Sequence, residues 1–236
     1  MDEPSQNAAT VARRLIPFAL LGILVLASGV AAVVATRPST SSTVPGPEGV
    51  SIVAAPDLAP ASSTLQGQPV GQIRCVTEAN EVVNFHTHTY VSIFVNGSER
   101  RLPGGIGITQ PWLVETFPSG VFYDVGPKNC IYWIHTHTAD NIVHVEAPAK
   151  GVFTLGELFA VWDQPLSANQ VGPAIGPVIV FVNGRAQHGD VATIQLVDHG
   201  TIQINVGSPV VVQTPKNYVV TGLCGQGTKG CAAPKS

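Results

Sequence analysis

From about residue 72 onward, apolar and polar residues alternate in short runs, which is the pattern of β-strands that bury one face. The clearest runs are residues 82–95, 131–137, 142–147, 178–182 and 201–206, with a shorter one at 193–196. Two of them end in an Asn-Gly dipeptide, Asn96-Gly97 and Asn183-Gly184, which favours the tight turn of a β-hairpin. The pattern predicts a mainly β domain, either an antiparallel β-sandwich or a barrel-like sheet.

One short helix is predicted to cover this sheet. Thr154 and Glu157 match a capping box, in which each side chain satisfies a free backbone N–H at the start of a helix. The residues that follow place one apolar face at helical spacing, made of Leu155, Leu158, Phe159 and Trp162. We expect Pro165 to end the helix, because proline cannot continue its hydrogen bonding.

A different pattern comes before the β region. Residues 15–35 carry no charge, and such a run is long enough to cross a ~30 Å hydrocarbon core as a helix. Arg13 and Arg14 precede it, and only Arg37 follows closely. The positive-inside rule therefore predicts a single-pass anchor at residues 15–36 in the bacterial cytoplasmic membrane, with residues 1–14 in the cytoplasm. A signal peptide cleaved after Val33-Val34-Ala35 is the alternative.

Composition divides the rest of the chain into three parts. Residues 37–70 are rich in Pro, Ser, Thr, Ala and Gly, which predicts an extended linker. Residues 71–221 form the expected extracytoplasmic, and so periplasmic, β domain. Residues 222–236 form a C-terminal tail with a small disulfide loop.

The charge balance excludes one class of partner and suggests another. The net charge is −3, so no basic face argues for nucleic acid. Charged residues make up only 11% of the chain, against roughly 25% in ordinary soluble domains. Such a surface suits contact with the lipid bilayer or with other subunits. One hypothesis is therefore an accessory subunit, without metal, of a larger respiratory or photosynthetic electron-transfer complex in the membrane.

All four cysteines follow the expected anchor, and an even count in an oxidising compartment suggests disulfides. Cys224 and Cys231 enclose a Gly-rich hexapeptide and are expected to pair, which leaves Cys75 with Cys130. A zinc site made of these cysteines is disfavoured because the chain has no Cys-x-x-Cys pair.

Five of the seven histidines fall in three strand-like segments. These are His86-Thr87-His88, His135-Thr136-His137 and His144-Val145-Glu146. Residues two apart in a strand point to the same face, so each segment presents two polar groups side by side. The candidate metal ligands are His86, His88, His135, His137, His144 and Glu146. His188 and His199 lie in expected turns and are interpreted as surface residues.

The expected hairpin turn fixes a register for these side chains. If Asp140 and Asn141 are the two central turn residues, His137 lies opposite His144, and His135 lies opposite Glu146. Opposed residues have Cβ atoms ~5 Å apart, close enough to share one ion. His86 and His88 join them if their strand is the neighbour of this hairpin.

Three or four imidazoles with one carboxylate suit a divalent transition metal, namely Zn²⁺, Cu²⁺, Fe²⁺ or Mn²⁺. A blue-copper centre is disfavoured, because it needs a Cys thiolate and usually an axial Met, and the only methionine is Met1. The other interpretation is a metal-free polar network or a partner surface. No nucleophile or phosphate-binding motif is present, so we expect no turnover.

The histidine segments also carry a resemblance. Segments 85–97, 130–138, 144–148 and 153–159 resemble a family of uncharacterised bacterial proteins, and the part Tyr-Trp-x-His-Thr-His is the most specific. The resemblance covers roughly residues 72–210 and implies an N-terminal anchor with an extracytoplasmic domain, without an activity.

A weaker resemblance is to cupins, whose first motif pairs His-x-His with a following Glu and a later Gly. His86, His88 and Gly97 match parts of that motif, while Ser92 or Ile93 stands in the place of the Glu. This resemblance implies a cupin-like metal-dependent enzyme, which would need an open coordination position at the ion.

Overall fold

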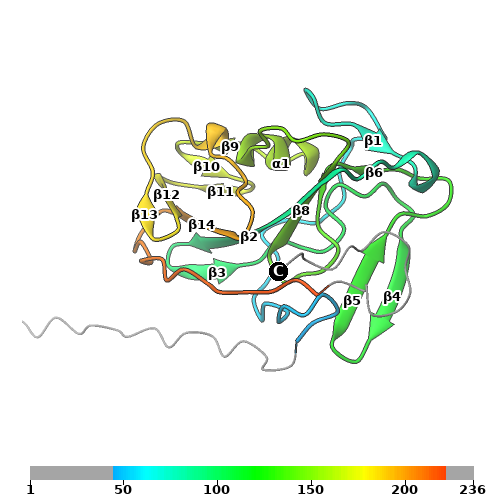
Figure 1. Ribbon diagram of the computed structural model, residues 1–236. Coiled ribbons are helices and arrows are strands. Elements are labelled where there is room, and N and C mark those ends of the chain that lie inside the picture. Colours follow the sequence, from blue (N-terminus) through cyan, green and yellow to red (C-terminus); the bar gives the residue numbers. More distant parts are fainter. Residues whose placement is uncertain (1–44, 222–236) are drawn as a thin grey trace, which may run out of the picture. The chain divides into compact units, whose positions relative to one another are not determined.

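The computed structural model describes residues 45–221, and this region is mainly β. Its centre is a sheet of seven strands (Figure 1). The path through the sheet is β13 (Arg185–Ala186), β12 (Val178–Val182), β14 (Gly200–Val206), β2 (Phe85–Val95), β8 (Ile142–Ala147) and β7 (Ile134–His135), with β3 (Ser98–Arg100) paired to β2 beside this path.

Three smaller sheets surround the central one. They are β1 (Cys75–Val76) with β6 (Ile131–Tyr132), β4 (Leu113–Phe117) with β5 (Gly120–Asp124), and β9 (Leu166–Ser167) with β10 (Gln170–Val171) and β11 (Ala174–Ile175). Two short 3-10 helices, η1 (Glu78–Asn80) and η2 (Val191–Thr193), lie in connections. The second overlaps residues 193–196, which were expected to be a strand. There Gln195 makes only an isolated bridge to Thr154.

Both Asn-Gly hairpins are confirmed. Asn96 and Gly97 connect β2 to β3, and Asn183 and Gly184 connect β12 to β13. All four residues have positive φ, at 50° and 75° in the first turn and 49° and 81° in the second. Two successive positive φ values define the type I′ turn, whose twist matches that of the flanking strands.

The central sheet is mixed, which corrects the expectation of a purely antiparallel domain. β14 runs parallel to β2, from Gly200 opposite Thr89 to Val206 opposite Val95. Parallel neighbours need a long connection, and here it contains β3 to β13 and the helix. Alternation within a strand does not reveal the direction of its neighbour, so the sequence pattern could not show this pairing.

The helix α1 (Leu155–Val161) begins as expected. Thr154 and Glu157 form a complete capping box, and Leu155, Leu158, Phe159 and Trp162 are buried. The helix ends at Val161, with Trp162 as its C-cap, before Pro165, because Asp163 takes a left-handed conformation with φ of 59°.

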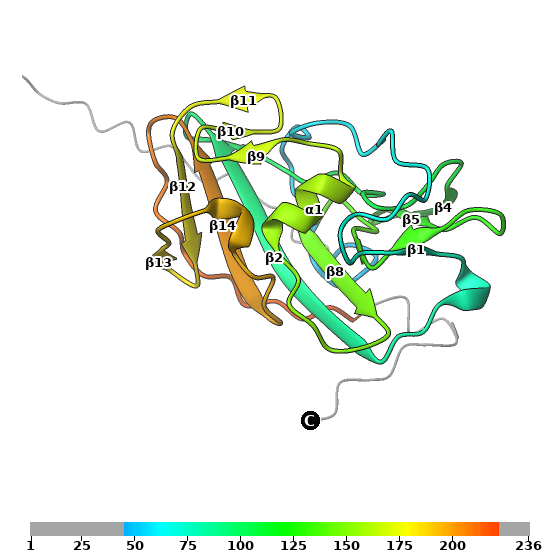
Figure 2. The ribbon, with the colours of Figure 1, turned by 90° about the horizontal axis from the view of Figure 1, so that it is seen from above.

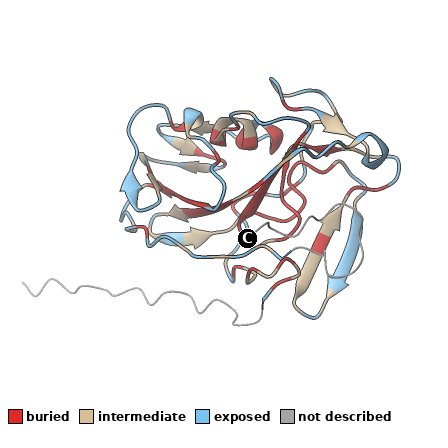
Figure 3. Ribbon diagram, viewed as in Figure 1, coloured by how far each residue is buried: buried red, intermediate tan, exposed pale blue. Residues whose placement is uncertain are grey.

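The two faces of the central sheet have different roles. Val91, Ile93, Val143 and Val145 point to the face that packs against α1 in the main hydrophobic core, and Figures 1 and 2 show α1 lying across β2 and β8 on that side. The alternate positions of the same strands, which include the histidines, point to the opposite face. Buried residues concentrate in β2, β8 and β14 (Figure 3).

Residues 45–70 differ from the linker that their composition suggests. Val50, Val53, Leu58 and Ala61 are buried, and Val53 N–H donates to the carbonyl of Ala139. The stretch has almost no regular secondary structure, which fits its Pro-rich composition, but it packs against the domain. The folded domain therefore begins earlier than residue 71.

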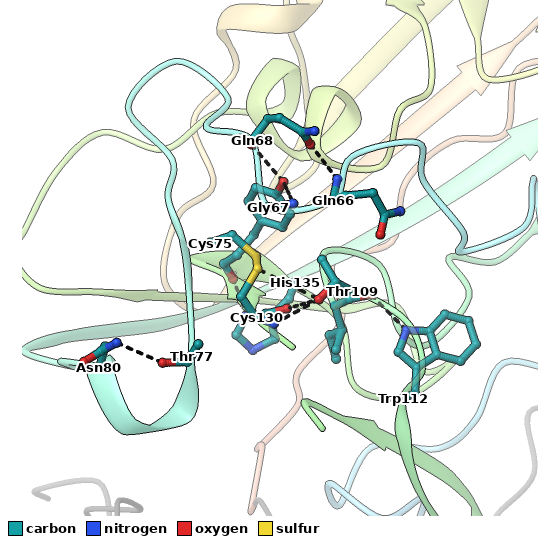
Figure 4. Close-up of a disulfide and its surroundings, with 12 residues drawn as sticks. Gln66, Gly67, Gln68, Cys75, Thr77, Asn80, Thr109, Trp112, Cys130 and His135 are labelled. Carbon is teal, nitrogen blue, oxygen red and sulfur yellow. Dashed lines mark hydrogen bonds between the residues drawn. A yellow bond between two sulfur atoms is a disulfide. The ribbon is translucent and has the colours of Figure 1, made fainter. Parts of the chain in front are cut away.

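The expected anchor at residues 15–36 and the C-terminal tail with Cys224 and Cys231 lie outside the described residues. Among residues 45–221, no helix has the length and apolar character that spanning a bilayer requires. The other expected disulfide, Cys75–Cys130, is present and joins β1 to the residue before β6 (Figure 4).

Candidate metal centre

The histidines form a row across three adjacent strands. His88 on β2 lies opposite His144 on β8, and His135 on β7 lies opposite the same His144 from the other side. Glu146 lies opposite His86 in the next row. The strand of His86 and His88 is therefore the neighbour of the histidine hairpin, which is the condition for these two residues to join the cluster.

The expected register of the hairpin is wrong by two residues. His135 pairs with His144 instead of Glu146, because residues 136–141 form a wide bend in place of a two-residue turn. A shift of two keeps each side chain on its face, so the histidines still converge. Asn141 has a φ of 70°, and its Oδ1 accepts a hydrogen bond from Leu102 N–H across the bend.

His137 comes from this bend and not from a strand. Its ring stacks on Phe122 of β5, with centroids 4.4 Å apart. Its Nδ1 lies 2.7 Å from the carbonyl oxygen of Tyr123. The β4–β5 hairpin therefore positions a donor that the sequence had placed in the central sheet.

His135 and His137 present their Nε2 atoms to each other at 3.1 Å. His135 Nδ1 lies 2.9 Å from the carbonyl oxygen of Tyr132, and His137 Nδ1 has the similar contact to Tyr123. A carbonyl oxygen only accepts, so each Nδ1 carries the ring's proton and each neutral ring has a bare lone pair on Nε2. Two lone pairs therefore face each other. His135 is fully buried, so solvent does not separate them from its side.

His144 contributes the third imidazole. Its Nε2 lies 2.8 Å from Oε1 of Glu48, an ion-pair contact whose alignment falls outside hydrogen-bond geometry. Its Nδ1 is buried and has no hydrogen-bond partner among the described residues. In a typical metal-bound histidine, one ring nitrogen contacts a carboxylate and the other nitrogen binds the metal.

Glu146 supplies the carboxylate. Its Oε1 lies 3.9 Å from His144 Nδ1 and 2.9 Å from His86 Nε2. One potential ligand atom from each of His135, His137, His144 and Glu146 lies within 4.8 Å of all the others. A second group, His86, His88 and His144, meets the same criterion. The six predicted residues thus form two groups that share His144.

The charges of the site follow from burial. Burial first, and then the neighbouring His137, lowers the pKa of His135 to about 3, and burial with His144 lowers the pKa of His88 to about 2. These rings are neutral at ordinary pH, which is the state that binds metal. Burial acts to raise the pKa of Glu146, but its hydrogen bond with His86 and the nearby histidines hold it well below the usual range.

Two carboxylates of the site had no signal in the sequence. Glu48 is 1% exposed, and Thr138 Oγ1 donates to it. Burial acts to raise its pKa, but His144, together with His137 and Thr138, outweighs burial and brings the pKa down to about 2. Glu81 lies beside Glu146, and burial together with Glu146 and Asp124 raises its pKa to about 7. His188 and His199 are exposed, as expected.

Comparison with known proteins does not bear on the role of this site. No protein-family model matches the chain, and neither a curated protein nor a solved structure matches it.

Proposed function

We propose that this domain binds one divalent transition-metal ion through His135 Nε2, His137 Nε2, His144 Nδ1 and the carboxylate of Glu146. The observation that carries the proposal is the pair of facing Nε2 atoms, 3.1 Å apart, on rings whose Nδ1 atoms are both engaged by carbonyls. Two nitrogens bound to one Zn²⁺ at ~2.0–2.1 Å in tetrahedral geometry lie about 3.3 Å apart. A cation between them turns a repulsive contact into two bonds.

The donor set suggests which ion and which role. Three imidazoles and one carboxylate fill a tetrahedral shell, and a shell filled by protein ligands is typical of zinc sites that hold structure. We therefore propose Zn²⁺ first, with Cu²⁺, Fe²⁺ and Mn²⁺ as alternatives. Each imidazole has a second contact on its other nitrogen, and such contacts fix the ring for metal binding. The proposed role is binding without turnover.

The proposed setting is outside the bacterial cytoplasmic membrane, with the segment 15–36 as a single-pass anchor. The Cys75–Cys130 disulfide supports this setting, because disulfides persist in oxidising compartments. The low charge content supports contact with the bilayer or with another membrane protein.

Metal content of the purified protein tests the proposal. The full-length chain is purified in mild detergent, and its metals are measured by elemental analysis. We expect about one transition-metal ion per chain, lost in His137→Gln and in His144→Gln. The matched control is His188→Gln, an exposed histidine away from the site, which keeps the metal. Absence of stoichiometric metal from the wild type removes the proposal and leaves the metal-free accessory subunit.

A further inference from the structure

The second histidine group lies between the buried donors and solvent. The side chain of His86 is 36% exposed and that of His144 is 4% exposed, while His88 has intermediate burial. The ring centroid of His88 lies 4.5 Å from that of His86 and 4.6 Å from that of His144, and the centroids of His86 and His144 are 5.9 Å apart, so the three rings form a triangle. This group thus extends from the partly exposed His86 to the buried His144.

The two groups compete for the same donor. His144 belongs to both groups, and its Nε2 faces Glu48 at 2.8 Å, so Nδ1 is its one available nitrogen. Two divalent cations a few ångströms apart repel strongly in a buried site, and the two groups together contain one carboxylate, Glu146. One ion at a time is therefore the arrangement that the geometry favours.

Glu146 connects the groups in a similar way. Its Oε1 accepts from His86 Nε2 at 2.9 Å and also faces the inner donors. Because Nε2 of His86 donates to Glu146, the nitrogen of His86 left for an ion is Nδ1. Glu146 therefore fixes the outer ring of His86 while its carboxylate also faces the inner donors.

We propose that His86 and His88 form the site where the ion first binds, and that the ion then passes to His135, His137 and Glu146 while His144 remains a ligand. This inference rests on the proposed function and adds the route by which the metal enters. His88 is a transient ligand, since the four inner donors complete the coordination of the resting ion. Its ring packs against those of His86 and His144 and belongs only to the outer group, so a flat ring in its place should leave the four inner donors intact.

The test follows Co²⁺ binding to the metal-free full-length protein. The d–d absorption of bound Co²⁺ reports uptake in a stopped-flow instrument, a chelator chase reports release, and competition with a chelator gives the affinity. The variants are His88→Phe, which keeps a flat ring of similar size, and His88→Gln, which serves if the first does not fold. The matched control is His188→Phe, an exposed histidine outside both groups.

We expect saturation at about one Co²⁺ per chain. Both His88 variants should take up and release Co²⁺ more slowly by the same factor, with the affinity almost unchanged, because a route changes rates and not the equilibrium. Uptake at the wild-type rate overturns the inference, as does binding of two ions or an affinity that falls with the substitution. A wild type that binds no Co²⁺ overturns the proposed function itself, which separates the two failures.

Discussion

The Nε2 atoms of His135 and His137 face each other at 3.1 Å, although the two residues belong to differently supported parts of the chain. β7 holds His135 against β8, while the β4–β5 hairpin holds His137 through Tyr123 and Phe122. An ion at this point therefore cross-links the central sheet to the smaller hairpin.

Metal removal is expected to destabilise the domain for this reason. At free metal about 1,000 times the dissociation constant, binding adds ~4 kcal/mol to the free energy of unfolding. Chelation of the full-length protein should lower its thermal midpoint, and restored metal should raise it again. The His137→Gln variant should show no response to the chelator. An equal response in that variant would mean that the stabilising ion binds elsewhere.

The Glu48–His144 contact predicts a pH-dependent stability. Because the pKa of Glu48 is lowered from 4.5 to about 2, its contribution is present above pH 4.5 and is lost as the pH falls towards 2. Near neutral pH, Glu48→Gln should lower the free energy of unfolding of the metal-free protein by ~3 kcal/mol. Denaturant unfolding at several pH values checks this.

The control for Glu48 is Glu115→Gln, an exposed carboxylate on β4, which should match the wild type throughout. The difference between Glu48→Gln and the wild type should shrink steadily below pH 4.5. A difference that stays constant down to the acid limit would show that the charge of Glu48 is not what stabilises the protein.

Metal binding is expected to release a proton from Glu81. Burial and the charges of Glu146 and Asp124 raise its pKa to about 7, so it is protonated below that pH. A cation at Glu146 favours the ionised form of Glu81, and the affinity should therefore rise with pH up to about 7 and then level off. In Glu81→Gln this rise should flatten. Titrations at a series of pH values measure it, and an unchanged profile would exclude Glu81 as the source.

Loss of the Cys75–Cys130 disulfide should affect both the fold and the site. The two cysteines are 55 residues apart, and in the chain-entropy treatment a loop of that size contributes about 4 kcal/mol. The bond anchors the segment that continues through Tyr132, whose carbonyl accepts from His135. The Cys75→Ser/Cys130→Ser variant should unfold more easily and bind metal more weakly, by calorimetry and by chelator competition. If the wild-type protein kept its full stability in reductant, the prediction that the disulfide stabilises the fold would be wrong.

The sequence pattern predicted the site residues better than it predicted the pairing. Alternation placed His135, His144 and Glu146 on one face, and a register error of two residues preserves that result. The error arose because Asp140 and Asn141 resemble a tight turn. The true bend is wider, and its last residue, Asn141, is fixed by Leu102 from another segment. Long-range contacts of this kind leave no local pattern.

The two unexpected carboxylates show the same limit. Glu48 stands between proline and glycine in a stretch without periodicity, and only folding brings it to His144. Glu81 is one of two acidic residues between β1 and β2, with Glu78. Residue type and spacing identify ligands within strands, whereas the groups that orient those ligands come from irregular segments.

The parallel pairing of β2 with β14 has a consequence for the order of assembly. Every candidate metal ligand, from His86 to Glu146, leaves the ribosome before Gly200–Val206 does, because synthesis runs from the N-terminus. A growing chain thus holds all its metal-binding side chains while one long edge of β2 still lacks its neighbour. Early capture of an ion would gather these segments before the last strand arrives to close the sheet.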